Sequence, residues 1–197
     1  IMLILLFADV LAARLPGAAL FGLLVLAALF VLRYPFYTWS DMALSLFGAA
    51  YIGFLMSFAL RLAAFPDAFA IAVLCLSITW GSDIGGYVFG RLWGKHKLTP
   101  LLSPNKTWEG ALGALLVASA LAWVWSRLVQ FPLTPSQVIL LAMAGSICAQ
   151  LGDLFESGMK RFLGAKDSGR IIPGHGGVLD RFDSLLLVLP LVYIVLC

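Results

Sequence analysis

Charged side chains are scarce in this chain of 197 residues: 12% are Asp, Glu, Lys or Arg, whereas 62% are hydrophobic. A water-soluble domain usually has about a quarter charged residues and about half apolar ones. A soluble fold of this length could not bury so much apolar surface, so the composition excludes that class and makes lipid the solvent for most of the chain. The net charge of +3 is small and no basic run occurs, which argues against nucleic-acid binding.

Cysteine is also rare. Cys75, Cys148 and Cys197 lie in apolar stretches and have neither a CxxC partner nor metal-ligand spacing, so we interpret them as small core side chains. The chain opens inside an apolar run and lacks the charged region and small-residue cleavage site of a signal peptide. We expect further sequence, with additional helices, upstream of residue 1.

Long apolar runs are what the sequence has in abundance. A membrane-spanning helix needs about 20 mostly apolar residues. Six stretches qualify, and residues 1–15 form a candidate tail of a seventh: 17–32, 39–60, 68–89, 108–129, 135–155 and 178–197. Pro, Gly and aromatic residues separate the stretches. The sequence therefore predicts an all-α fold, a polytopic transmembrane helix bundle with about six or seven spans.

Basic residues collect on one side of this predicted bundle. Six crossings place the loops after the first, third and fifth helices on the same side, and ten of the thirteen basic residues fall there. These are Arg33, Arg91, Lys95, Lys97, Lys106, Lys160, Arg161, Lys166, Arg170 and Arg181. The positive-inside rule predicts that this side faces the cytoplasm.

Most acidic residues gather on the same side, in the loops or in the helix turns that enter them. They are Asp83, Glu109, Asp153, Glu156, Asp167, Asp180 and Asp183. Asp83 is expected to end the third helix and the pair Asp153/Glu156 the fifth, while Asp180 and Asp183 begin the sixth. Residues three apart share a helical face, so two carboxylate pairs can converge. Because charges in hydrocarbon must be paired or hydrated, the pairs predict headgroup-level salt bridges, a divalent-cation site, or both.

Two polar blocks surround the first of the long basic loops. Residues 82–87 read Ser-Asp-Ile-Gly-Gly-Tyr, and Gly-Arg and Gly-Lys follow at 90–91 and 94–95. Glycines at a helix end admit close approach of a ligand, although packing between helices explains them equally well. Residues 103–110 read Ser-Pro-Asn-Lys-Thr-Trp-Glu-Gly, and a helix start of this kind favours an anion, with Lys106 adding charge suited to phosphate. A capped helix with a snorkelling lysine is the alternative.

A third block, from Gln150 to Asp183, carries most of the polar chemistry. The glycines around His175 are able to form a nest of backbone N–H groups for phosphate oxygens. Lys160, Arg161, Lys166 and Arg181 are suited to neutralise phosphate charge. Asp153 and Asp180 supply the hard oxygen ligands that Mg²⁺ prefers. The block therefore predicts a metal-dependent phosphate site.

This third block also carries a resemblance to a known family. Residues 157–183 read Ser-x2-Lys-Arg-x4-Lys-Asp-x5-Pro-Gly-His-Gly-Gly-x2-Asp-Arg-x-Asp. The run resembles the signature of the phosphatidate cytidylyltransferases, also called CDP-diacylglycerol synthases. The blocks at 82–95 and 103–110 are similar to two further segments of that family, so the resemblance covers 82–183. Asn105 departs from many members, and members usually carry additional N-terminal spans.

The resemblance implies the transfer of a cytidylyl group from CTP to phosphatidate, which gives CDP-diacylglycerol and pyrophosphate. It implies N-terminal transmembrane helices over 1–66 and a catalytic transmembrane domain over 67–197. It further implies a homodimer in a bacterial inner membrane, an active site facing the cytoplasm, and Mg²⁺ as cofactor, with a second, monovalent cation such as K⁺ left open. Nucleic acid is not an expected partner.

The residue roles that follow are expectations for this chain. The catalytic set is Asp153, Asp180, Lys160, Arg161, Lys166, His175 and Arg181. The substrate-binding set is Asp83, Ser103, Lys106, Glu109, Gly174, Gly176 and Gly177. Asp153 and Asp180 are the expected metal ligands, with Asp183 and Glu156 as further ligands or as groups that support them.

The chemistry is consistent with these residues, because the nucleophile would be a phosphate oxygen that is already ionised at pH 7. We find no nucleophile–base motif such as GxSxG, and positioning with charge neutralisation suffices. Two alternatives remain. One is a CTP-dependent enzyme acting on another lipid, such as a CDP-archaeol synthase or a lipid kinase. The other is a cation transporter, which would place carboxylates near mid-bilayer on broken helices.

Overall fold

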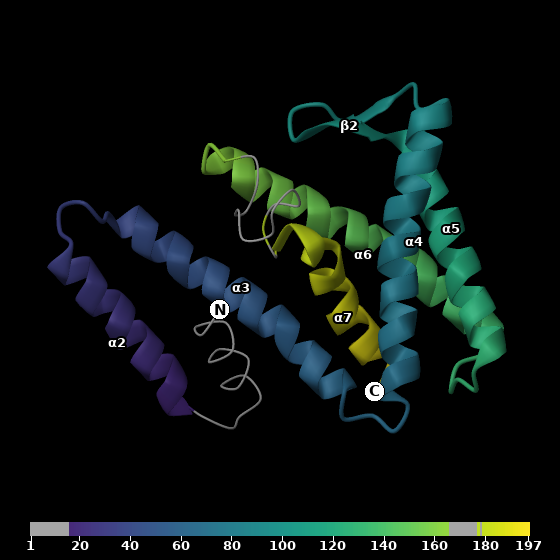
Figure 1. Ribbon diagram of the computed structural model, residues 1–197, viewed down its shortest axis with the longest axis horizontal. Coiled ribbons are helices and arrows are strands. Elements are labelled where there is room, and N and C mark those ends of the chain that lie inside the picture. Colours follow the sequence, from purple (N-terminus) through teal and green to yellow (C-terminus); the bar gives the residue numbers. More distant parts are fainter. Residues whose placement is uncertain (1–15, 166–176, 178) are drawn as a thin grey trace. The chain divides into compact units, whose positions relative to one another are not determined.

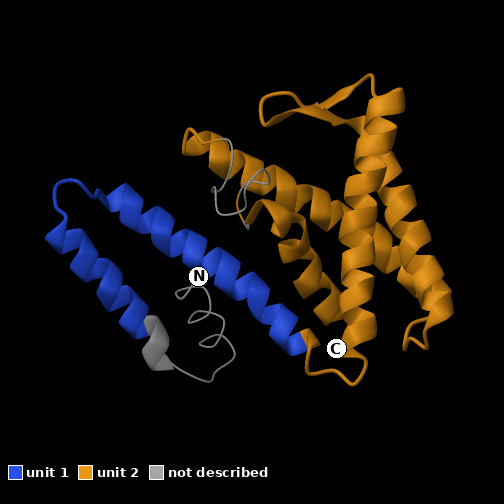
Figure 2. Cartoon of the chain, in the orientation of Figure 1, with its two compact units in different colours: residues 1–61 blue, residues 62–197 orange. Residues whose placement is uncertain are grey.

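The computed structural model describes residues 16–165, 177 and 179–197 (Figure 1). Contacts divide the chain into two compact units, 1–61 and 62–197, which are coloured separately in Figure 2. The division falls a few residues before the boundary expected at 66/67. Each unit is described by itself, and the polar motifs lie in the second.

The first unit contains a helical hairpin. Helix α2 (Pro16–Leu32) is followed by α3 (Trp39–Leu62). The start of α3 is capped reciprocally: Thr38 N–H and its hydroxyl both donate to Asp41 Oδ2 at 2.8 Å, and Asp41 N–H donates to Thr38 Oγ1. The rings of Phe30 and Trp39 lie 4.8 Å apart, which brings the adjoining helix ends together.

The second unit has α4 as its central helix. The order is α4 (Ala68–Trp93), β1 (Lys97–Thr99), β2 (Ser103–Thr107), α5 (Trp108–Leu128), α6 (Pro135–Phe162), the 3-10 turn η1 (Leu179–Arg181) and α7 (Asp183–Leu196). Helix α4 contacts α5, α6 and α7. Their shared core includes Ile71, Leu74, Ile78, Ala118, Val138, Ala142, Leu186 and Val192, all at most 2% exposed.

Helices α4 and α5 lie side by side and touch through their backbones (Figure 1). A Cβ at Gly85 would lie within 2.9 Å of Ala114 Cα and closer still to the Gly113 carbonyl. A Cβ at Gly81 would lie 2.8 Å from Ala118 Cα. Small residues at a crossing allow membrane helices to approach closely. This contact fixes the position of α4 relative to α5 below the polar site.

A short antiparallel hairpin, β1–β2, connects α4 to α5, which the all-helical prediction did not include. Its registered pairs are Lys97 with Thr107 and Thr99 with Ser103. The segment 97–107 lacks the alternation of apolar and polar residues that marks a strand, so the sequence gave little signal for it. The hairpin matters for the site because Lys106 lies on β2 and Thr107 ends it.

Helix α6 continues beyond the end expected at 155. It begins with a capping box between Thr134 and Gln137 and with Pro135 in its first turn. It ends where Gly164 adopts a left-handed φ of 66°, with Gly164 N–H donating to Arg161 O and Ala165 N–H to Lys160 O. Since no helix breaker precedes Gly164, Lys160 and Arg161 belong to the last turn of the helix and not to a loop.

Two other expected positions need correction. Asp83 does not end its helix, because α4 continues to Trp93 and its C-cap is Gly94. Asp180 does not lie on the final helix beside Asp183, because it belongs to η1 and α7 begins only at Asp183. The two carboxylates therefore do not share one helical face.

Among the described residues, four helices are long and apolar enough to cross a membrane: α3, α4, α5 and α6. Two other apolar helices, Leu20–Leu32 and Asp183–Leu196, are shorter. The structure therefore confirms a helical membrane protein with a small two-stranded sheet. The expected count of six or seven spans is not confirmed by the described helices.

Candidate functional site

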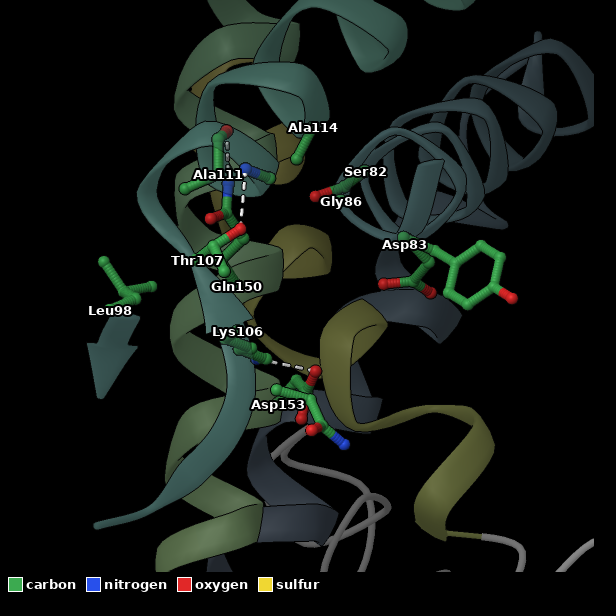
Figure 3. A pocket seen from close by; sticks show the side chains of 13 residues that line it. Ser82, Asp83, Gly86, Leu98, Lys106, Thr107, Ala111, Ala114, Gln150 and Asp153 are labelled. Carbon is green, nitrogen blue, oxygen red and sulfur yellow. Dashed lines mark hydrogen bonds and ion pairs between the residues drawn. The ribbon is translucent and has the colours of Figure 1, made fainter. Parts of the chain in front are cut away.

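A cavity of about 330 Å³ lies between α4, the hairpin, α5 and α6 (Figure 3). One wall comes from α4 and carries Ser82, Asp83, Gly86 and Tyr87. The remaining wall is lined by Leu98, Asn105, Lys106, Thr107, Gly110, Ala111, Ala114, Gln150 and Asp153. The cavity thus unites residues from all three sequence blocks.

Lys106 and Asp153 form an ion pair on one side of this cavity. The Lys106 ammonium lies 2.7 Å from Asp153 Oδ2, with side-chain exposures of 22% and 35%. The Lys106 Nζ is shielded from solvent and makes no well-directed hydrogen bond, so the contact is mainly electrostatic. Asp153 Oδ1 also accepts a hydrogen bond of 3.3 Å from the Ser157 hydroxyl.

The start of α5 fixes where Lys106 sits. Thr107 is the N-cap of α5, and its Oγ1 accepts a hydrogen bond of 3.1 Å from Gly110 N–H. Thr107 is only 5% exposed. The capping function of Thr107 was not foreseen, although the Thr-x-x-Gly spacing at a helix start was visible. Lys106 is therefore held by a strand on one side and a capped helix on the other.

Asp83 faces Lys106 and Asp153 from the opposite wall, as Figure 3 shows. It interacts electrostatically with Asp153 and Asp183, both of like charge, and with Lys106. Ser184, at the start of α7, lies within hydrogen-bonding range of Asp83. Three carboxylates near one ammonium leave an excess of negative charge, which favours the binding of a further cation.

A second polar cluster lies at the end of α6. Lys160 Nζ contacts Glu156 Oε2 at 2.9 Å and Asp180 Oδ1 at 2.7 Å. Asp180 Oδ2 accepts a hydrogen bond of 2.7 Å from Gly177 N–H. Glu156 is 2% exposed and lies beside Asp183, and its Oε1 has no hydrogen-bond donor among the described residues. Asp183 thus lies between the two clusters.

Close packing between α6 and α7 brings these clusters together. A Cβ at Gly152 would lie 2.5 Å from the Asp183 carbonyl oxygen and 3.4 Å from Ser184 Cα. Gly152 directly precedes Asp153 in α6. Because these backbones touch, the carboxylates of Asp153 and Asp183 belong to the same region of the molecule, even though they lie far apart in sequence.

A hydrogen-bonded floor beneath the cavity connects α4, α5 and α6. The buried hydroxyls of Ser82 and Ser146 lie 2.9 Å apart. Gln150 Nε2 donates to Ser146 Oγ and to Ala111 O, each at 3.4 Å. The sequence analysis did not single out Ser146, since a serine within an apolar helix gives no signal until its partner on another helix is known.

Glu109 holds the hairpin to the start of α5. Its carboxylate accepts hydrogen bonds from Lys95 N–H at 3.1 Å and from His96 N–H at 3.3 Å, and lies 2.7 Å from His96 Nδ1. Glu109 does not line the cavity, and neither does Ser103. Their assignment as substrate ligands stays a prediction.

The remaining predicted site residues are distributed unevenly. Arg161 is exposed in the last turn of α6, and Arg181 lines a separate cavity beside Asp83. Lys166, Gly174, His175 and Gly176 lie outside the described residues. Within the described part, the structure brings together the carboxylates of three elements and two of the predicted lysines.

The donor set fits Mg²⁺ in its chemistry, because carboxylate oxygens are hard ligands and Glu156 Oε1 is buried without a donor. Among the residues that the structure describes, however, no group of three His, Cys, Asp or Glu side chains is arranged to hold a metal ion. Asp153 and Asp180 are each paired with a lysine instead. Mg²⁺ binding would therefore require these lysines to move.

Apolar helices that surround a cavity of opposed carboxylates and lysines define the class of this protein: an integral membrane protein with a site for polyanions and cations. The chain belongs to the cytidylyltransferase family, whose model matches residues 1–197. The resemblance drawn from the motifs is thereby confirmed.

Three relatives named phosphatidate cytidylyltransferase come from staphylococci. The chain is 46% identical over 162 residues to the protein of Staphylococcus haemolyticus, 44% to that of Staphylococcus epidermidis and 42% to that of Staphylococcus aureus. Each match covers 81% of this chain and 61% of the relative. The chain thus spans about 61% of the length of these relatives.

Proposed function

We propose that this chain transfers the cytidylyl group of CTP to phosphatidate, giving CDP-diacylglycerol and pyrophosphate. The names of its relatives support this function. The structural observation that carries it is the cavity in which Asp83, Lys106 and Asp153 face one another between apolar helices. Such a cavity suits a reaction between a water-soluble polyanion and an anionic lipid.

The reaction joins two polyanions. An oxygen of the phosphatidate phosphate attacks the α-phosphorus of CTP, and the bond to the β-phosphate breaks as pyrophosphate leaves. The attacking oxygen is already ionised at neutral pH, so no protein base has to remove a proton. The protein therefore has to align the two phosphates and offset their mutual repulsion.

The lysines carry out this task in the proposal. Lys106 and Lys160 turn from their carboxylate partners toward phosphate oxygens when the substrates bind. Arg161, together with Lys166 and His175, extends the positive surface for the triphosphate. Gly177 and its neighbours Gly174 and Gly176 offer backbone N–H groups. Each contact replaces part of the hydration of a phosphate oxygen.

Asp153 and Asp180 would hold Mg²⁺, with Asp183 and Glu156 beside them. Bound Mg²⁺ supplies the positive charge that draws the two phosphates together. The carboxylates orient around it because α6, η1 and α7 hold them in one region. We leave a monovalent ion such as K⁺ as a second possibility for the same carboxylates.

The proposal extends to the setting of the enzyme. The site faces the cytoplasm, in line with the basic loops, because CTP is a cytosolic nucleotide. Six or seven spans, a bacterial plasma membrane and a homodimer complete it.

The experiment that tests the function is incubation of the purified protein with labelled CTP, phosphatidate and Mg²⁺, followed by measurement of lipid-extractable label. A panel of other lipid phosphates distinguishes phosphatidate from alternative acceptors. Label in no lipid product would overturn the proposal, and ion flux in proteoliposomes without CTP turnover would favour a transporter.

The metal assignment has its own test. Asp153→Asn and Asp180→Asn should each lower product formation at least a hundredfold at saturating Mg²⁺. Asp67→Asn is the matched control, since Asp67 is exposed before α4 and makes no side-chain cap. Near-normal activity of both variants would show that these residues are not the metal ligands.

A further inference from the structure

A second, smaller cavity lies between α4 and the segment formed by η1 and the start of α7. Its volume is about 190 Å³. It is lined by Leu76, Thr79, Trp80, Asp83, Arg181, Phe182, Ser184 and Leu185. The lining is mainly apolar, with one guanidinium and few other polar groups. This composition differs from that of the larger cavity, where amide, hydroxyl and lysine side chains are frequent.

Asp83 lines both cavities. It is the point at which the two spaces adjoin, with Lys106 and Asp153 on one side and Arg181 on the other. Two ligands held in the two cavities would therefore have their nearest groups beside this carboxylate. That arrangement suits a reaction between two substrates that arrive from different surroundings.

The smaller cavity has the character of a surface that meets lipid. Trp80 is 59% exposed and Phe182 is 42% exposed. Trp80 belongs to α4, one of the helices able to span a membrane, so its exposed ring is placed to meet hydrocarbon or the headgroup boundary. An acyl chain that lies against these rings would be in an environment like the bilayer it left.

The polar groups of the smaller cavity select the kind of headgroup. The hydroxyl of Thr79 donates to backbone carbonyls of its own helix, Cys75 O at 3.1 Å and Leu76 O at 3.2 Å. Arg181 therefore stands as the cation of this lining. A guanidinium binds a phosphate through two parallel hydrogen bonds, which a phosphomonoester at the end of a lipid offers.

We propose that the smaller cavity is the phosphatidate subsite, with Arg181 binding the lipid phosphate and Trp80, Phe182 and Leu185 lining the glycerol ester region. CTP occupies the larger cavity, and Asp83 marks the boundary where the two phosphates meet. This inference rests on the proposed function and adds which substrate enters where. A free phosphate or pyrophosphate would gain nothing from the apolar walls, so the lipid is the occupant.

Steady-state kinetics in mixed micelles tests the assignment. Arg181→Gln should raise the KM for phosphatidate about tenfold or more, since a charge-assisted contact is lost, while the KM for CTP changes less than twofold. Arg181→Lys should recover only part of the loss, because an ammonium lacks the planar fork. Trp80→Leu should also raise the KM for phosphatidate. The controls are Arg127→Gln and Trp123→Leu, exposed residues of α5 outside both cavities.

Photocrosslinking supplies a readout that does not depend on turnover. A phosphatidate with a diazirine near its ester should label the segment 179–185 or Trp80, and Arg181→Gln should reduce this labelling severalfold. Unlabelled phosphatidate should compete, whereas diacylglycerol, glycerol 3-phosphate and inorganic phosphate should compete weakly.

The outcomes separate the two proposals. Arg181-dependent labelling in a protein that makes no CDP-diacylglycerol would support the subsite and overturn the proposed function. Turnover in which Arg181→Gln raises the KM for CTP alone, or labelling that inorganic phosphate abolishes, would overturn the subsite.

Discussion

Lys160 of α6 and Asp180 of η1 form an ion pair of 2.7 Å although twenty positions separate them in the chain. The same nitrogen lies 2.9 Å from Glu156 Oε2. One ammonium thus serves two carboxylates, one of them on its own helix and the other on the segment that leads into α7. The pair fixes the spacing between the end of α6 and the start of α7.

The first prediction concerns stability. Lys160→Met removes the cation beside Glu156, which is 2% exposed, so a buried carboxylate loses its partner. We expect a loss of about 3 kcal/mol in the free energy of unfolding, measured by denaturation in detergent micelles. The double variant Lys160→Met/Glu156→Gln should recover more than half of it. A double variant as unstable as the sum of the single changes would contradict this coupling.

The second prediction concerns nucleotide binding. Lys106→Gln leaves Asp153 without its ion-pair partner and removes a point charge from the larger cavity. We expect the KM for CTP to rise about tenfold or more, as measured by initial rates at saturating phosphatidate. Lys97→Gln on strand β1 is the matched control, because Lys97 is exposed and lies outside the cavity. Equal effects of the two changes would show that only general charge matters.

The third prediction compares two glycines in helices. At Gly48 a Cβ would meet nothing within 4 Å, whereas at Gly85 it would meet the backbone of Gly113 and Ala114. Gly48→Ala should be neutral or stabilising, by up to about 1 kcal/mol, because alanine favours the helix. Gly85→Ala should lower the unfolding temperature and the affinity for CTP. Two similar unfolding temperatures would show that α4 and α5 do not approach this closely.

The fourth prediction places a functional effect at the contact between α6 and α7. A Cβ at Gly152 would lie 2.5 Å from the Asp183 carbonyl oxygen, while at Gly158 it would meet Leu102 Cδ2 at an ordinary 3.5 Å. Gly152→Ala should therefore move Asp183 and lower kcat at least tenfold by initial-rate assay. Gly158→Ala on the same helix should leave kcat within twofold. A normal kcat for Gly152→Ala would exclude a precise role for Asp183.

The fifth prediction separates the two partners of the hairpin anchor. His96 has a side-chain exposure of 78%, so His96→Ala should cost less than about 1 kcal/mol. Glu109→Ala should cost more, because the backbone N–H groups of Lys95 and His96 both lose their acceptor. Denaturation curves of both variants provide the measurement. If the two costs were equal, the exposed ion pair would account for the whole contact.

Much of the fold follows from the sequence, because hydrophobic length determines where helices can cross lipid. The starts of α3 at Trp39, α4 at Ala68, α5 at Trp108 and α6 at Pro135 were expected at these residues. Helix ends were less accurate, since polar residues such as Lys160 and Arg161 continue a helix until a breaker such as Gly164 occurs. The β1–β2 hairpin gave no periodic signal that would distinguish it from a loop.

The candidate site was predicted as a set of residues but not as a set of contacts. The spacing of Glu156 and Lys160 places them on one helical face, so their pairing follows from the sequence. The pairing of Lys160 with Asp180 does not, because it depends on how the chain returns after α6. The backbone contacts of Glu109 likewise depend on the hairpin, and the bond between Ser82 and Ser146 depends on the crossing of α4 and α6.

The position of Asp83 in the middle of α4 has a consequence for kinetics. Helix α4 contacts every other helix of the second unit and carries the carboxylate that borders both cavities. A change in how α4 sits is therefore felt by nucleotide and lipid at once, so the affinities of the two substrates are thermodynamically linked through one helix. Substitutions in its packing should alter both Michaelis constants together, whereas those at Lys106 or Arg181 alter one each.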